Sequence, residues 1–141
     1  MAFTMPVAVR YLEVDAQGVV FNAWYLAWFD EAMAAFLAHG GLPYASMVAA
    51  GFDVQLVRSE IGWKAGIGFG DQVEIAVSTA RIGHTSFALD FEVRRGAGGE
   101  VTCTARTVYV VIATDGTGKR KVPALIADAL GGHPTRDASR G

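Results

Sequence analysis

The sequence predicts an α+β fold in which one long helix covers one face of a five-stranded antiparallel sheet. The stretch Ala23–Ala38 is rich in Ala, Leu, Met, Trp and Phe and carries only two charges, a composition typical of a packed helix. After Gly51 the pattern changes to a period-2 alternation with many β-branched and aromatic side chains, which is typical of strands. Turn-forming clusters separate the last strands, so consecutive strands should pair antiparallel.

The first elements are a strand, the long helix and a short helix. Val7–Leu12 alternates with period 2 and predicts the strand. The long helix then begins with Asn22 as its N-cap, because Asn is one of the residues preferred there. Gly40-Gly41-Leu42-Pro43 ends this helix, and a short second helix is expected over Tyr44–Ala50.

Four more strands complete the predicted sheet. They are expected at Phe52–Lys64, Gln72–Ile82, Thr85–Arg95 and Val101–Ala113. Glycine-rich turns at Gly96–Gly99 and Asp115–Gly118 favour hairpins, and Pro123–Leu130 is expected to form a final short helix. We expect residues 1–130 to form a single domain and residues 131–141 to be a loose tail.

The bulk properties are those of an ordinary soluble domain. A net charge of −2 with 18% charged residues argues against general nucleic-acid binding. The chain has no signal-peptide pattern and no apolar run long enough for a membrane span, so a cytoplasmic location is the default expectation. The lone Cys103 cannot form an internal disulfide and is expected to be a packed thiol.

The segment between the first strand and the long helix carries the most suggestive chemistry. Asp15-Ala16-Gln17-Gly18 forms a predicted turn shortly before the helix begins. Free N–H groups at a helix start attract developing negative charge, and a nearby carboxylate can act as a base or a nucleophile. On this evidence alone, Asp15 is better explained as a turn residue whose side chain bonds the local backbone.

The motif order resembles the hotdog-fold thioesterases of the 4-hydroxybenzoyl-CoA type. Their D-x-x-G-h-V signature, in which h is apolar, reads Asp15-Ala16-Gln17-Gly18-Val19-Val20 here. Further matches are Tyr25, Asp30, Gly41-Leu42-Pro43 and Phe69-Gly70-Asp71. The resemblance implies a sheet curled around the helix, thioester hydrolysis without a separate cofactor, and CoA as part of the substrate. It also implies homodimers, often paired into homotetramers, with active sites at the dimer interface.

The resemblance assigns roles at the predicted catalytic site. Asp15 falls on the catalytic aspartate, which attacks the thioester carbonyl or activates water. The backbone N–H of Asn22 falls on the oxyanion donor, and capping by the Asn22 side chain is compatible with that role. Gly18 is expected to provide positive φ and to allow a substrate to approach closely.

The expected substrate-binding residues fall into two groups. Trp24, Tyr25 and Trp63 are expected to line an acyl or aryl pocket. The segment Arg81-Ile82-Gly83-His84-Thr85-Ser86-Phe87 resembles the family segment that contacts pantetheine and nucleotide, although Gly83 and His84 replace residues that are commonly basic. The basic run Lys119-Arg120-Lys121 is a further candidate for CoA phosphates, or for the acidic surface of an acyl carrier protein.

Several alternatives stay open. In another branch of the hotdog thioesterases the catalytic carboxylate lies on the central helix, so Asp30 or Glu31 is an alternative catalyst. In that branch a His-Gly-Gly element opens the helix, whereas in this chain His39-Gly40-Gly41 closes it. Asp30 is otherwise expected to be a partly buried acid with a partner, and Glu60 to be structural. The function alternatives are an acyl-ACP thioesterase and a non-catalytic acyl-binding protein, and a dehydratase is less favoured. No metal site is expected, since the histidines lie in separate segments.

Overall fold

The computed structural model describes residues 3–132, so most of the predicted tail, residues 133–141, lies outside the described residues. The strands are β1 (Phe3–Ala8), β2 (Phe52–Trp63), β3 (Gln72–Ile82), β4 (Ser86–Arg95) and β5 (Glu100–Ala113). The α helices are α1 (Trp24–His39), α2 (Tyr44–Ala49) and α3 (Ala124–Ala129), and a 3-10 turn, η1, spans Tyr11–Glu13. This order confirms the predicted α+β fold.

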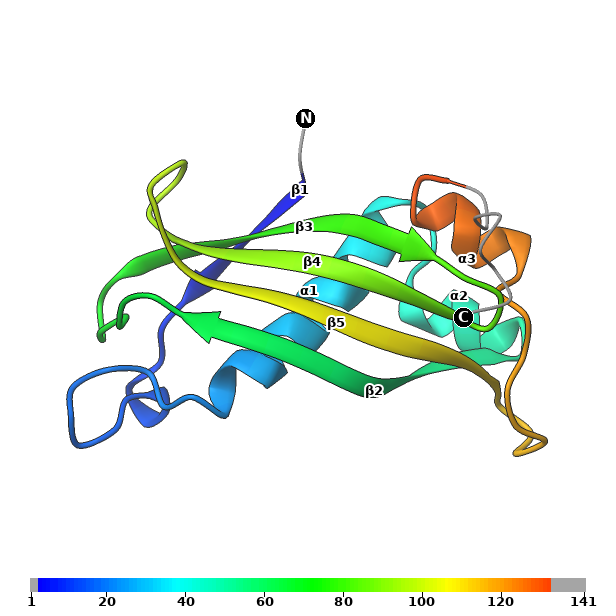
Figure 1. The fold of residues 1–141 in the computed structure, drawn as a ribbon, viewed down its shortest axis with the longest axis horizontal. Coiled ribbons are helices and arrows are strands. Elements are labelled where there is room, and N and C mark those ends of the chain that lie inside the picture. The colour runs from blue at the N-terminus through cyan, green and yellow to red at the C-terminus, as the bar shows by residue number, and fades with distance from the viewer. Residues whose placement is uncertain (1–2, 133–141) are drawn as a thin grey trace.

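The five strands form one antiparallel sheet in the order β1-β3-β4-β5-β2. The long helix α1 lies across one face of this sheet, and α2 and α3 lie near the C-terminal end of α1 (Figure 1). The two edge strands, β1 and β2, come from opposite sides of α1 in the sequence. With α1 against one face, this sheet has the arrangement expected for the hotdog fold.

The core lies between the sheet and the inner face of α1. That face buries Tyr25, Trp28, Phe29, Ala32, Met33 and Leu37. Phe29 stacks on Phe91 of β4 with ring centroids 4.7 Å apart. Only this face of the predicted packed helix is buried, because the sheet covers one side of α1 and leaves Leu26, Asp30 and Glu31 exposed in the single chain.

The predicted first strand is wrong in its position. The strand ends at Ala8, and the chain turns into η1 where the sequence pattern predicts a continued alternation to Leu12. The cause is a local bond network, in which the Glu13 N–H donates to the Arg10 carbonyl at 2.9 Å and the Glu13 carboxylate accepts the Arg10 N–H at 2.7 Å. These bonds close a tight turn that an extended strand could not form.

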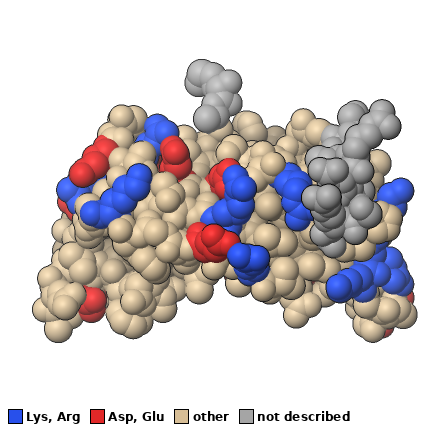
Figure 2. Space-filling view, in the orientation of Figure 1, with Lys and Arg blue, Asp and Glu red and all other residues tan. Residues whose placement is uncertain are grey.

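The outward face of the sheet is polar. Figure 2 shows acidic and basic side chains next to one another on this face, and they include the ion pairs Arg58–Glu60, Arg94–Glu92 and Arg106–Asp90. Glu60 is thus paired on the surface, in agreement with its expected structural role. Among residues 3–132, no helix is long and apolar enough to cross a bilayer.

Candidate active site

The segment from Asp15 to Val19 forms a closed loop next to the start of α1. The Asp15 N–H donates to the Val19 carbonyl at 2.9 Å, and the Gly18 N–H donates to the Asp15 carbonyl at 3.0 Å. Gly18 has a φ of +80°, which confirms the predicted positive φ and explains why glycine suits this position. The Val20 N–H then bonds the Ile67 carbonyl at 2.7 Å, so the loop is attached to the segment after β2.

The Asp15 side chain is half-buried, and only one of its carboxylate oxygens accepts a hydrogen bond within the loop. Its Oδ1 accepts the Gln17 N–H at 2.8 Å, the local bond that the plain turn interpretation requires. Its Oδ2 has no hydrogen-bond partner among residues 3–132. Asp15 therefore serves as a turn residue while one carboxylate oxygen remains available for chemistry.

The start of α1 presents unused backbone donors. The Trp24 N–H bonds the Phe21 carbonyl at 3.0 Å, and the Tyr25 N–H bonds the Asn22 carbonyl at 3.2 Å. The N–H groups of Asn22 and Ala23 have no backbone acceptor within the described part of the chain. Such donors, together with the positive end of the helix dipole, form a site that favours negative charge.

The predicted capping role of the Asn22 side chain is wrong. The N-cap is Ala23, with helical φ and ψ of −65° and −25°, and it has no side-chain cap bond. Asn22 instead lies inside a turn closed by the Phe21–Trp24 bond, and its side chain is exposed. The backbone N–H of Asn22 is unaffected by this correction.

Asp15 and Asn22 line the same cleft, which has a volume of about 740 Å³. Its lining residues are Asp15, Ala16, Gln17, Val19, Val20, Phe21, Asn22, Tyr25, Trp63, Lys64, Ala65 and Gly66. The structure thus brings four predicted site residues together, from the loop, from the start of α1 and from the end of β2. Trp24 does not line this cleft, because its ring packs beneath the Arg10 guanidinium at 5.5 Å.

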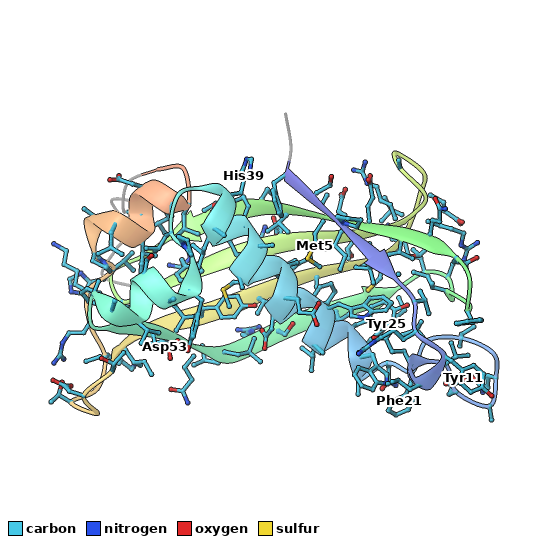
Figure 3. The ribbon with its side chains drawn as sticks, turned by 180° about the vertical axis from the view of Figure 1, so that it is seen from behind. Met5, Tyr11, Phe21, Tyr25, His39 and Asp53 are labelled. Atoms are coloured by element: carbon cyan, nitrogen blue, oxygen red, sulfur yellow. The ribbon has the colours of Figure 1, made fainter. Side chains whose placement is uncertain are left out.

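Tyr25 forms the inner wall of the cleft. Its side chain is only 1% exposed, and it meets the ring of Trp63, which is 48% exposed, edge to face with centroids 5.7 Å apart. Figure 3 shows Tyr25 near the first turns of α1, with Phe21 and Tyr11 at the same end of the molecule. The Tyr25 hydroxyl has no hydrogen-bond partner among the described residues.

Burial keeps two groups near this wall protonated. It raises the pKa of Tyr25 to about 12, with a smaller contribution from the nearby Cys103. Burial alone raises the pKa of the Cys103 thiol to about 12. Cys103 is fully buried, which confirms the expected packed thiol, and Tyr25 remains a hydrogen-bond donor at neutral pH.

The remaining predicted binding residues lie at the opposite end of the sheet. Val93 and Trp63 both pair with Cys103 at the cleft end, whereas Ser86 pairs with Val110 of the same strand. At ~3.3 Å per residue, the stretch from Cys103 to Val110 spans about 23 Å. Arg81, His84, Thr85 and the run Lys119–Lys121 lie at or beyond that far end. Within one chain they therefore do not meet Asp15.

The far end carries a basic cluster of its own. His84, Lys119 and Lys121 are exposed, and the His84 carbonyl accepts the Val122 N–H at 2.8 Å, which joins the β3–β4 turn to the segment after the basic run. Figure 2 shows basic side chains gathered at this end of the molecule. The Arg81 Nη1 atom is buried and has no partner among residues 3–132. Arg120 instead bonds Thr117 within its own hairpin.

Asp30, the rival catalyst, lies outside the cleft. Its carboxylate is exposed rather than partly buried, and it accepts the Tyr109 hydroxyl hydrogen bond at 3.1 Å. That bond agrees with the expectation of a partnered acid. Across residues 3–132, no three His, Cys, Asp or Glu side chains gather closely enough to hold a metal ion.

The sequence analysis did not assign the cleft residues Phe21 and Lys64 to the site. Phe21 precedes the helix and is 48% exposed, and Lys64 follows the last residue of β2. Phe21 directly follows the Asp15–Val20 signature, and this position is a signal that could have identified it. Lys64 carries no such signal, because its proximity to Asp15 depends on how the end of β2 meets the loop.

The sequence is similar to those of known thioesterases. A sequence profile of the thioesterase-like superfamily matches residues 9–130. The 1,4-dihydroxy-2-naphthoyl-CoA hydrolase of Synechococcus elongatus is 27% identical over 124 residues, which cover 86% of this chain and 90% of the relative.

Solved structures share the fold. A 1,4-dihydroxy-2-naphthoyl-CoA thioesterase from Synechocystis matches with a TM-score of 0.81 at 23% identity, covering 92% of this chain and 96% of that chain. A mutant 4-hydroxybenzoyl-CoA thioesterase, solved as a complex with 4-hydroxybenzoyl-CoA, gives a TM-score of 0.81 at 22% identity, covering 92% and 98%. These likenesses agree with the hotdog arrangement of the sheet and α1.

Proposed function

Because this chain belongs to the thioesterase-like superfamily, we propose that it hydrolyses an acyl- or aryl-CoA thioester to the free acid and CoA. One observation carries the proposal: Asp15, a half-buried acid, and Asn22, whose N–H has no backbone acceptor among the described residues, line the same cleft. A carboxylate and an oxyanion donor are the two groups that acyl transfer to water needs.

The start of α1 would stabilise the negative charge that develops on the thioester oxygen. The Asn22 N–H and the helix dipole favour charge at that point, and the neighbouring Ala23 N–H is also unbonded. Removing one such donor typically lowers the turnover rate by about two to three orders of magnitude. The donor is part of the backbone, so the side chain at position 22 has little influence on it.

Asp15 would act in one of two ways. As a nucleophile, its carboxylate attacks the carbonyl carbon, expels the CoA thiolate and forms an anhydride, which water then cleaves to the acid. As a general base, it takes a proton from water while the resulting hydroxide attacks the carbonyl and CoA thiolate departs. A thiolate is a good leaving group, so neither route requires a strong acid. After hydrolysis in ¹⁸O-water, label in the Asp15 carboxylate would identify the nucleophilic route, because water enters Asp15 only by cleaving the anhydride at the Asp15 carbonyl.

The wall formed by Tyr25 and Trp63 suits a flat or apolar acyl group. The two rings present an apolar surface beside the carbonyl position, and Phe21 adds another exposed ring at the entrance. The relatives named above act on 1,4-dihydroxy-2-naphthoyl-CoA and 4-hydroxybenzoyl-CoA. An aryl-CoA ester is therefore the first substrate class to test.

A homodimer would bring further basic residues to the cleft, in addition to Lys64. The cluster of Arg81, His84 and Lys119–Lys121 is too far from Asp15 in one chain, so only a second copy could bring it to the same substrate. The exposed apolar side chains of Trp63, on the edge strand β2, and of Leu26, on α1, offer surface for that copy. The nucleotide phosphates of CoA would then bind the partner's basic cluster.

The test is thiol release from a panel of short-chain, long-chain and aryl CoA thioesters, with the matching acyl carrier protein thioesters alongside. Hydrolysis of one CoA class is the expected result. Hydrolysis only of carrier-protein thioesters would favour that partner, which the exposed Lys119 and Lys121 also suit. Saturable binding of acyl-CoA without turnover would instead identify a non-catalytic binding protein and would contradict the proposal.

A further inference from the structure

The buried carboxylate of Glu13 lies two residues before Asp15 and is not part of the cleft. Its side chain is only 2% exposed, which is unusual for a glutamate. Both carboxylate oxygens are bonded: Oε1 accepts the Arg10 N–H at 2.7 Å, and Oε2 accepts the Trp28 indole N–H at 2.9 Å and the Arg10 guanidinium at 3.1 Å. The carboxylate therefore joins the 3-10 turn to helix α1.

The backbone of Glu13 controls the other side of the loop. Its carbonyl accepts the Phe21 N–H at 2.9 Å, at the point where the chain leaves the loop and approaches α1. One step further inside, Val14 and Val20 form an isolated bridge. The Glu13 side chain thus holds α1 through Trp28, while its main chain holds the far end of the loop through Phe21.

We propose that Glu13 is a positioning residue, which sets the Asp15 carboxylate against the Asn22 N–H through its bonds to Trp28, Arg10 and Phe21. This inference rests on the proposed function, since it assigns Asp15 the reacting carboxylate. Arg10 adds a second link, because its guanidinium lies over the ring of Trp24, one helical turn before Trp28. Placement matters because a shift of about 1 Å in a catalytic group can lower turnover by about a hundredfold.

Two variants remove different parts of this connection. Glu13→Gln keeps the size of the side chain but removes the charge that binds Arg10 and Trp28. Trp28→Phe keeps an aromatic ring while it removes the indole donor together with some buried ring volume, so it serves where Glu13→Gln fails to fold. Glu60→Gln is the matched control, because it makes the same charge change on the exposed outer face of the sheet, where Glu60 pairs with Arg58.

Kinetics with the best thioester substrate give the first readout. We expect Glu13→Gln to lower kcat about 10- to 100-fold with KM changed less than about threefold, and Trp28→Phe to lower kcat less. In the Asp15→Asn background, Glu13→Gln should cause no further loss, because its effect acts through Asp15. A loss confined to KM, an additive loss in the double variant, or an equal loss in Glu60→Gln would overturn the proposal.

Amide hydrogen exchange gives a readout that does not depend on activity. We expect the Asp15 and Phe21 amides to exchange at least tenfold faster in Glu13→Gln and in Trp28→Phe, while β4 amides such as Phe91 keep their rates. If the Asp15 and Phe21 amides exchange at the native rate in both variants, the inference is contradicted even if the enzyme is active. If the native protein hydrolyses no thioester, the proposed function fails, yet this experiment still decides whether Glu13 holds the loop.

Discussion

Tyr25 and Trp63 meet edge to face with their ring centroids 5.7 Å apart, and they join the first turn of α1 to the end of β2 at the wall of the cleft. Tyr25 also packs against Trp28 and Phe29 of its own helix, with centroids at 5.1 and 6.4 Å. The ring is thereby fixed in the core while its hydroxyl has no partner among the described residues. This arrangement separates a structural role of the ring from a binding role of the hydroxyl.

Tyr25→Phe should therefore weaken substrate binding and leave the stability of the fold nearly unchanged. The variant keeps the ring contacts, so we expect the free energy of unfolding to change by less than about 1 kcal/mol. Loss of a hydrogen bond to the acyl group would raise KM about 2- to 10-fold. Tyr25→Ala, by contrast, should cost about 3–5 kcal/mol because it empties the core. Denaturant unfolding and steady-state kinetics check both, and an unchanged KM in Tyr25→Phe would exclude a binding role for the hydroxyl.

Two substitutions at Asn22 distinguish its backbone from its side chain. Asn22→Ala keeps the N–H and removes only an exposed side chain that caps nothing, so kcat should stay within about threefold of the native value. Asn22→Pro removes the N–H, and proline is compatible with the second position of the turn closed by the Phe21–Trp24 bond. We expect this variant to lose about a hundred- to a thousandfold in kcat. Equal activities in the two variants would rule out the Asn22 N–H as the oxyanion donor.

A pair of glycine substitutions tests the geometry of the loop. Gly18 and Gly51 have φ values of +80° and +96°, and a Cβ at either position would meet no atom within 4 Å. Gly18→Ala and Gly51→Ala should each cost about 1–2 kcal/mol from backbone strain alone. Only Gly18→Ala should also lower kcat per folded molecule, because Gly51 lies between α2 and β2, away from the cleft. Thermal unfolding and kinetics on both variants provide the comparison.

The pH dependence of stability tests the buried charge of Glu13. Burial alone would raise its pKa, but hydrogen bonds from the Arg10 backbone, the Trp28 indole and the Arg10 guanidinium outweigh that effect and hold the pKa below its ordinary value of 4.5. The resulting stabilisation is present above pH 4.5 and is lost as the pH falls through the lower folded-state value. The free energy of unfolding should therefore fall more steeply with acidification in the native protein than in Glu13→Gln. Parallel pH curves would mean that Glu13 contributes no such stabilisation.

The sequence could predict the sheet and α1 because their periodic patterns are long and agree with the turn residues between them. The position of β1 was not predictable in this way, since Val7–Leu12 alternates like a strand while the bonds to Glu13 close a turn. The prediction that Asn22 is the N-cap of α1 was wrong for a similar reason. Local preference favours Asn at a helix start, but the turn from Phe21 to Trp24 moves that start by one residue.

The site could be predicted only in part. Asp15, Gly18 and Asn22 were accessible because they lie close together in the sequence and match a family signature. That Asp15 and Asn22 share a cleft with Trp63 and Lys64 depends on the pairing of β2 with β5, which no local pattern specifies. The distance of His84 and Lys119 from Asp15 likewise follows from the pairing register along β5. Assignment of the chain to the thioesterase-like superfamily confirms the expected enzyme class, while the individual site residues remain predictions.

The most direct test of the account compares the native protein, Asp15→Asn and Asp30→Asn on the best CoA thioester, with folding checked by circular dichroism. We predict that Asp15→Asn loses at least about a hundredfold in kcat, because its amide can neither attack the carbonyl nor take a proton from water. Asp30→Asn should stay within about tenfold, because Asp30 lies outside the cleft and bonds Tyr109. A folded Asp15→Asn variant with native turnover, or a larger loss in Asp30→Asn, would contradict the central role of Asp15.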